Sequence, residues 1–248
     1  MNIMRHFNRI QSRSMPMNRK MENSDYTLID LHLHSHYSSD SSIPIKAIVQ
    51  SWQRTGILPL VCDHNTIAGS ARVYDEIHRL DPDIPEILAE EILTSDGEII
   101  GLFLQEEIPA GLRAEETLDA IRDQGALSIV PHPFCSFRSS VIRPDVLDRV
   151  IPRIDVIEGF NGRAVCEGDN LLARRYATVQ KKPVSAGSDA HTPQELGTTF
   201  VEMQPFSTPK EFIRSIRAPH IHYRRLQAFP HLLDRSGPGH GNLPGVAI

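Results

Sequence analysis

The chain has 248 residues, of which 40% are hydrophobic and 23% charged, and its formal net charge is −5. This composition is typical of a globular protein, and no apolar run approaches the ~20 residues of a membrane span, which excludes an integral membrane protein. The first 20 residues carry five basic side chains and no acid, so the rest of the chain sums to −10. That excess of acid argues against an extended nucleic-acid partner.

Three cysteines, Cys62, Cys135 and Cys166, are widely spaced and form no CxxC pair. This pattern indicates a reduced, cytoplasmic protein rather than a disulfide scaffold. Residues 1–24 are predicted to be a disordered or misassigned N-terminal extension, with a targeting segment as the alternative. Residues 25–225 are predicted to form one domain, and residues 226–248 a flexible tail that contains several Gly and Pro residues.

Strand-like runs alternate with helix-like segments through this domain. Strands are predicted at Tyr26–Leu33, Ile57–Cys62, Glu86–Leu93, Glu98–Leu104, Ala126–Pro131, Ile154–Gly159, Pro183–Gly187 and Thr199–Met203. Helices are predicted at Pro44–Arg54, Ile67–Leu80, Ala114–Gln124, Pro144–Arg149, Cys166–Gln180 and Pro209–Ile216. The third and fourth strands are expected to form a hairpin. The alternation predicts βα units and a mainly parallel sheet, either a barrel or an open doubly wound sheet.

Polar residues gather at the ends of these strands. The first strand ends in His32-Leu-His34, and residues two apart lie on one face of a strand. Other strands contribute Asp63, His64, Glu90, Glu91, Glu98, His132, Glu158, Asn161, Asp189 and His191. Taken singly, each could be structural, for example a helix cap or a core histidine. Together in a barrel they would meet at one mouth, where so many carboxylates would repel one another by several kcal/mol without cations. Histidine and carboxylate ligands suit Zn, Mn or Fe.

Four motifs in order resemble the PHP (polymerase and histidinol phosphatase) superfamily of metal-dependent phosphoesterases. They are Asp30-Leu-His32-Leu-His34-Ser, Asp63-His64-Asn-Thr66, Val130-Pro-His132-Pro133 and Gly187-Ser-Asp189-Ala-His191. The similarity covers about residues 27–205, and compact bacterial PHP-domain proteins are the nearest match in pattern. It implies an α/β fold, a distorted (β/α)7 barrel, with two or three divalent transition-metal ions (Mn, Zn or Fe) at the C-terminal ends of the strands.

The resemblance also implies three sets of ligands. One ion is expected on His32, His34, Glu91 and Asp189. A second would share Glu91 and take His132, and a third would take His64, His191 and the acid at Asp40. Glu98 stands where many members have a histidine ligand; it can still bind an ion and makes the second site richer in oxygen. Cys62 replaces a common threonine and is expected to be a packing change.

The expected reaction is hydrolysis of a small phosphomonoester, such as a sugar, amino-alcohol or nucleotide phosphate, by a metal-activated hydroxide. Asp63, His191, Arg138 and Arg163 are predicted to be catalytic, Asp63 by orienting a ligand histidine. The predicted phosphate contacts are Arg138, Arg143, Arg163 and Asn161. For each arginine the alternative is a solvated side chain on a loop.

Three other functions remain open. An amidohydrolase also begins with HxH on a barrel strand, but it needs a lysine at a strand end, and none is found there. A nuclease acting on short oligonucleotides could use the same ions. A regulatory metal-binding domain without catalysis is the third. The predicted partner is a small phosphorylated substrate. No membrane partner is expected, and the sequence predicts no oligomeric state.

Overall fold

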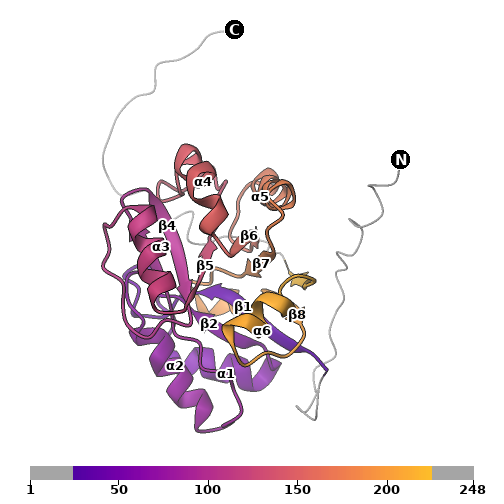
Figure 1. The fold of residues 1–248 in the computed structure, drawn as a ribbon. Coiled ribbons are helices and arrows are strands. Elements are labelled where there is room, and N and C mark those ends of the chain that lie inside the picture. Colours follow the sequence, from indigo (N-terminus) through magenta and orange to yellow (C-terminus); the bar gives the residue numbers. More distant parts are fainter. Residues whose placement is uncertain (1–24, 225–248) are drawn as a thin grey trace, which may run out of the picture.

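The structure is a computed structural model that describes residues 25–224, drawn in colour in Figure 1. The predicted N-terminal extension (1–24) and the predicted tail (226–248) lie outside the described residues. Within the described part, no helix has the length and apolarity that crossing a membrane would require. The strands occupy the middle of the molecule, and the helices lie around them (Figure 1).

The secondary structure follows the predicted elements closely. The strands are β1 (Thr27–Leu33), β2 (Leu58–Val61), β3 (Ala89–Thr94), β4 (Gly97–Leu102), β5 (Leu127–Val130), β6 (Val156–Asn161), β7 (Val184–Gly187), β8 (Thr199–Met203) and β9 (His220–Tyr223). The helices are α1 (Ile45–Thr55), α2 (Ala68–His78), α3 (Ala114–Asp123), α4 (Pro144–Val150), α5 (Glu167–Val179) and α6 (Pro209–Ser215), with 3-10 turns η1 (Ile151–Arg153) and η2 (Pro193–Glu195). Among the strands and α-helices of the described residues, only β9 was absent from the prediction, because its short, histidine-containing sequence lacks a strand-like apolar pattern.

The strands form two sheets with the orders β2-β1-β8-β9 and β3-β4-β5-β6-β7. The expectation of a mainly parallel sheet is correct only in part. The pairs β1–β2, β5–β6 and β6–β7 are parallel, whereas β3–β4, β4–β5, β1–β8 and β8–β9 are antiparallel. The predicted hairpin explains one exception, since a two-residue turn at Ser95-Asp96 can join only antiparallel strands.

Two isolated bridges connect the two sheets. A parallel bridge joins Leu33, at the end of β1, to Ala190 after β7, and a second joins His64, after β2, to Glu91 in β3. The sheets themselves are separate, so a closed barrel is not established. The bridges nevertheless bring the ends of β1, β2 and β7 and the middle of β3 to one place.

Local sequence signals set the limits of the elements around this place. Helix α1 ends at Gly56, which adopts a left-handed φ of 71° and donates its N–H to the Trp52 carbonyl. Helix α4 begins with Pro144, which needs no N–H in the first turn. From Ile29 onward β1 is buried. His32 in β1 and His34 just after it are both buried, so they do not lie on an exposed edge.

Candidate metal centre

The first group of predicted ligands has the spacing of a four-coordinate site. Nε2 of His32 lies 3.2 Å from Nε2 of His34, 3.5 Å from Oε2 of Glu91 and 3.6 Å from Oδ1 of Asp189. Nε2 of His34 lies 3.2 Å from the same Glu91 oxygen and 3.5 Å from the same Asp189 oxygen. Tetrahedral ligands with bonds of about 2.0–2.1 Å are separated by about 3.4 Å. These donor atoms therefore fit a single transition-metal ion.

A second group lies on the other oxygen of Glu91. Its Oε1 is 3.1 Å from Nε2 of His132, and that nitrogen is 3.6 Å from Oε2 of Glu98. Glu98 is buried, and its Oε2 accepts a hydrogen bond of 2.6 Å from the Ser140 hydroxyl. Glu98 thus faces the histidine that it was predicted to accompany, and it does not point into solvent.

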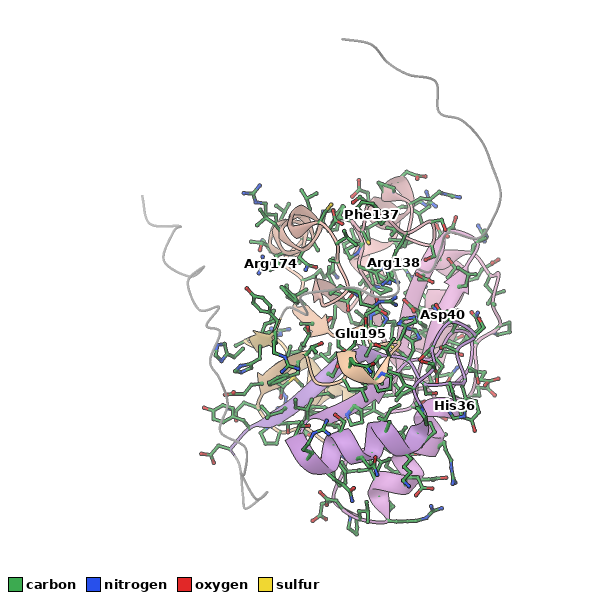
Figure 2. All side chains as sticks on the ribbon, turned by 180° about the vertical axis from the view of Figure 1, so that it is seen from behind. His36, Asp40, Phe137, Arg138, Arg174 and Glu195 are labelled. Atoms are coloured by element: carbon green, nitrogen blue, oxygen red, sulfur yellow. The ribbon has the colours of Figure 1, made fainter. Side chains whose placement is uncertain are left out.

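The third group lies nearer the surface. Oδ2 of Asp40 is 3.4 Å from Nε2 of His64 and 3.2 Å from Nε2 of His191. His64 also approaches the first group, since its Nδ1 is 3.3 Å from Oε2 of Glu91. The Asp40 side chain is 46% exposed, and Figure 2 labels it together with Arg138. We call the three groups together the metal centre: His32, His34, Asp40, His64, Glu91, Glu98, His132, Asp189 and His191.

Two of these predicted ligands have strained backbone. Asp189 follows β7 with a φ of 53°, and His132 follows β5 with a φ of 30°. Positive φ is uncommon for residues other than glycine and costs about 1–3 kcal/mol. Asp189 also donates its N–H to the His32 carbonyl, and this hydrogen bond joins the segment after β7 to β1. Strain of this kind is concentrated at functional sites.

Two buried carboxylate oxygens of the metal centre lack hydrogen bonds. Oε2 of Glu91 and Oδ1 of Asp189 are both buried without a hydrogen-bond partner. Such atoms are costly unless a cation compensates them. Burial by itself lowers the pKa of His34, but Asp189 and Glu91 outweigh it and raise this pKa to about 9. In the absence of ions, protons thus supply the positive charge here. The chemistry of the donor set therefore fits divalent metal ions.

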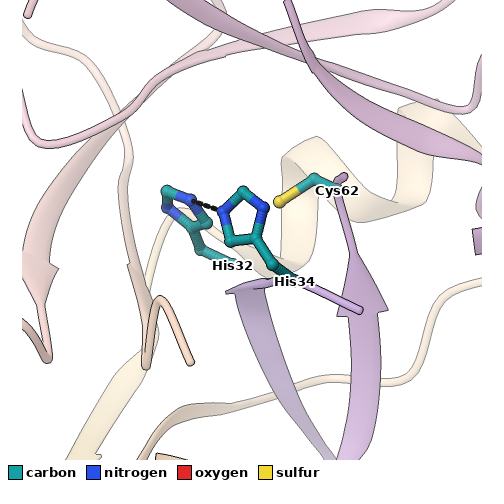
Figure 3. Close-up of side chains that lie close together, drawn as sticks. All are labelled: His32, His34 and Cys62. Atoms are coloured by element: carbon teal, nitrogen blue, oxygen red, sulfur yellow. Dashed lines mark hydrogen bonds between the residues drawn. The ribbon is translucent and has the colours of Figure 1, made fainter. Parts of the chain in front are cut away.

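The Nδ1 atoms of His32 and His34, which face away from the metal centre, are each held by a hydrogen bond. Nδ1 of His32 is 2.9 Å from Oε1 of Glu158, and Nδ1 of His34 is 3.0 Å from the Ser38 hydroxyl. Ser38 in turn donates to Oδ1 of Asp63 at 2.8 Å. Each Nδ1 is thereby assigned as the N–H, which leaves Nε2 to face the centre. Figure 3 shows the two Nε2 atoms turned toward one another.

Asp63 therefore lies where it can orient His34 through Ser38, in the manner predicted for it. Glu158 was not among the predicted site residues. Its Oε1 contacts His32, and its Oε2 accepts the backbone N–H of His132 at 2.7 Å. An acid near the end of β6 was the available signal, but nothing local in the sequence shows that it reaches a histidine 126 residues away.

Arg138 and Asn161 converge on Asp189. The Arg138 guanidinium pairs with Oδ2 of Asp189, and the Asn161 amide donates to the same oxygen at 3.0 Å. The amide also donates to Oε2 of Glu158 at 3.0 Å. Asn161, predicted to contact phosphate, is thus engaged in holding two carboxylates. Arg138 keeps 22% of its side chain exposed above the centre.

The other two predicted arginines pair with acids outside the metal centre. Nη2 of Arg143 is 2.7 Å from Asp96, in the β3–β4 turn, and its Nε is 3.8 Å from Asp145. Nε of Arg163 lies 3.6 Å from Oε1 of Glu195. Their predicted contact with phosphate stays a prediction.

Cys62 lies directly behind the paired histidines (Figure 3). Burial raises the pKa of its thiol well above the usual value, so the sulfur stays protonated. The thiol is directed at the Leu33 carbonyl, 3.7 Å away. This environment agrees with the packing role expected for Cys62.

Replacing Glu158 with glutamine is expected to lower kcat/KM about 10- to 100-fold, as losses of ligand-orienting groups do. The amide oxygen can replace Oε2, which accepts the His132 N–H and the Asn161 amide, but the amide nitrogen would then face the Nδ1–H of His32 and cannot accept it. Asp155→Asn is the matched control. Asp155 directly precedes β6 and also accepts hydrogen bonds, but from Ser128, which is outside the metal centre. Equal activity of wild type and Glu158→Gln would contradict the orienting role.

Comparisons with known proteins identify similar chains. A family model described as PHP-associated matches residues 167–220. The uncharacterised protein MJ0417 of Methanocaldococcus jannaschii is 36% identical over 199 residues, which cover 76% of this chain and 78% of the relative.

Solved structures share the fold at low identity. A two-domain protein from Bacteroides vulgatus that contains a predicted PHP-like metal-dependent phosphoesterase gives a TM-score of 0.64 at 16% identity, covering 86% of this chain and 70% of that one. The lesion-specific endonuclease EndoQ from Pyrococcus furiosus gives 0.52 at 17% identity, covering 79% of this chain and 57% of that one.

Proposed function

The chain belongs to the PHP superfamily of metal-dependent phosphoesterases, and on that premise we propose that it hydrolyses a phosphomonoester of a small molecule at the metal centre. The observation that carries the proposal is the shared position of Glu91. Its two oxygens lie within 3.5 Å of ring nitrogens of four histidines. A carboxylate so placed can bridge adjacent ions, and adjacent ions suit phosphoester hydrolysis.

Bound ions would supply a water molecule of lowered pKa and neutralise the charge of the phosphate. The protein's own residues have distinct tasks. Glu158 and Ser38 fix the histidine tautomers, and Asp63 holds Ser38. His191 donates Nδ1–H to the Asp189 carbonyl at 2.8 Å, which leaves Nε2 directed at Asp40. Mn, Zn and Fe are all compatible with this mixed nitrogen and oxygen donor set.

We also propose that β1–β7 form the distorted (β/α)7 barrel. The bridges Leu33–Ala190 and His64–Glu91 support it, since they connect β1 to the end of β7 and the end of β2 to β3. A cytoplasmic location is proposed from the three free cysteines, which fit a reducing compartment.

A small substrate is preferred to a nucleic acid because the chain beyond residue 20 carries a net charge of −10. The likeness to EndoQ keeps a nuclease as the second candidate. The test is a screen of Mn-loaded protein against sugar phosphates, nucleotides, nucleoside bisphosphates and short oligonucleotides. Release of inorganic phosphate from a small ester supports the proposal. Cleavage of oligonucleotides alone would favour the nuclease, and no hydrolysis by protein that contains its ions would favour the regulatory domain.

Arg138 is the arginine best placed to hold a phosphate. Because Asp189 is already paired with Asn161, and would be neutralised by an ion, the guanidinium can turn to an anionic substrate. Arg138→Ala is expected to raise KM about 10- to 100-fold, which corresponds to about 1.5–3 kcal/mol for a charged hydrogen bond. Arg149→Ala is the control, since Arg149 is half-exposed and pairs with Glu115. Steady-state kinetics with unchanged KM for Arg138→Ala would remove it from the phosphate site.

A further inference from the structure

A second cluster of metal-binding side chains lies on strands β8 and β9, apart from the metal centre. It consists of Glu202 on β8 and of His220 and His222 on β9. The two histidines alternate along β9, so they lie on one face, and Glu202 is the direct cross-strand partner of His220. One donor atom from each residue lies within 4.8 Å of the other two.

The contacts within the cluster are close. Nε2 of His222 is 3.0 Å from Oε2 of Glu202, and the rings of His220 and His222 have centroids 4.4 Å apart. The His222 ring stacks on Phe200, with centroids 4.8 Å apart and an interplanar angle of 11°. This stacking holds the His222 ring in place, so small rotations of Glu202 and His220 can bring all three donors around one ion.

An ordinary ion pair explains only part of this arrangement. A pair between His222 and Glu202 needs two residues, and it gives no role to the second imidazole beside it. Two imidazoles and a carboxylate that meet on a half-buried surface form the donor set of a zinc ion with one open position. The three side chains are partly accessible, so an ion can enter from solvent.

We propose that Glu202, His220 and His222 bind one Zn²⁺ ion, with water in the fourth position, and that this ion fastens β9 to β8. Strand β9 is the last strand of its sheet and pairs with β8 alone among the described strands. An ion between the two strands adds a cross-link to this short pairing. The site is independent of the proposed hydrolysis, because it shares no residue with the metal centre.

The test compares zinc content in the full chain and in conservative variants. Wild type, His220→Gln and Glu202→Gln are loaded with Zn²⁺, dialysed and measured by elemental analysis. His78→Gln is the matched control, because His78 is also half-buried and stacks on an aromatic ring, that of Tyr74. Comparing chains that all retain the metal centre cancels the ions bound there.

We expect His220→Gln and Glu202→Gln each to hold about one zinc ion fewer per chain than wild type and His78→Gln. Circular dichroism checks folding, and either of the two variants suffices if the other does not fold. The rise in Tm on adding Zn²⁺ should also be smaller in these variants. Equal zinc content in wild type and in a folded variant would overturn the proposal.

Discussion

Replacing Glu91 with glutamine is expected to lower kcat/KM for phosphoester hydrolysis by at least about 100-fold. Loss of a group that only orients a ligand costs about 10- to 100-fold, and Glu91 stands at the middle of the donors themselves. Its carboxylate is 3.1 Å from His132 and 3.2 Å from His34. A neutral amide removes the negative charge that both groups share and the oxygen donor of one of them. Elemental analysis should show fewer bound ions alongside the kinetic loss.

The neighbouring residue provides a matched control. Glu90 is also buried, but it faces away from the centre, where its Oε1 accepts the Ile108 N–H at 2.7 Å. Burial raises the pKa of Glu90 to about 7, so a neutral amide resembles its protonated form. Glu90→Gln should keep activity within a few-fold of wild type. If the two variants were equally impaired, the assignment of Glu91 as the shared ligand would be wrong.

Removal of the ions is expected to abolish hydrolysis, and reconstitution should restore it with two or three ions per chain at the metal centre. Because Glu98 adds a hard oxygen donor beside His132, Mn should restore more activity than Zn. Fewer than one ion per chain after reconstitution with Mn, Zn and Fe(II) would contradict the metal centre.

Ion binding should also release protons. The pKa of His34 is about 9 in the metal-free chain because Asp189 and Glu91 outweigh the effect of burial. At pH 8 its imidazole is therefore mostly protonated, and a metal ion must displace that proton. The same competition predicts that ions are lost as the pH falls. Titration of Mn²⁺ into chelated protein, with a pH indicator, measures the release; no proton release would show that His34 is not a ligand.

Much of the fold is determined by local sequence. The alternation in β1, the turn at Ser95-Asp96 and the proline that opens α4 each act within a few residues, and the structure confirms the elements that they predict. The order of the four motifs carries the family resemblance for the same reason, since it rests on short stretches of sequence. Local sequence did not predict the antiparallel pairing of β8 or the existence of β9, because the pairing partners of a strand depend on distant parts of the chain.

The arrangement of the site depends on tertiary structure. Local alternation places Glu90 and Glu91 on opposite faces of β3, but a slip of one residue in pairing would exchange them. The register of β3 against β4 and the bridge from His64 to Glu91 decide which carboxylate faces the histidines. Glu158 reaches His32 and Arg143 turns to Asp96 for the same reason. The sequence by itself therefore determined the elements and the chemical types of the ligands, whereas only long-range packing decided which side chains meet.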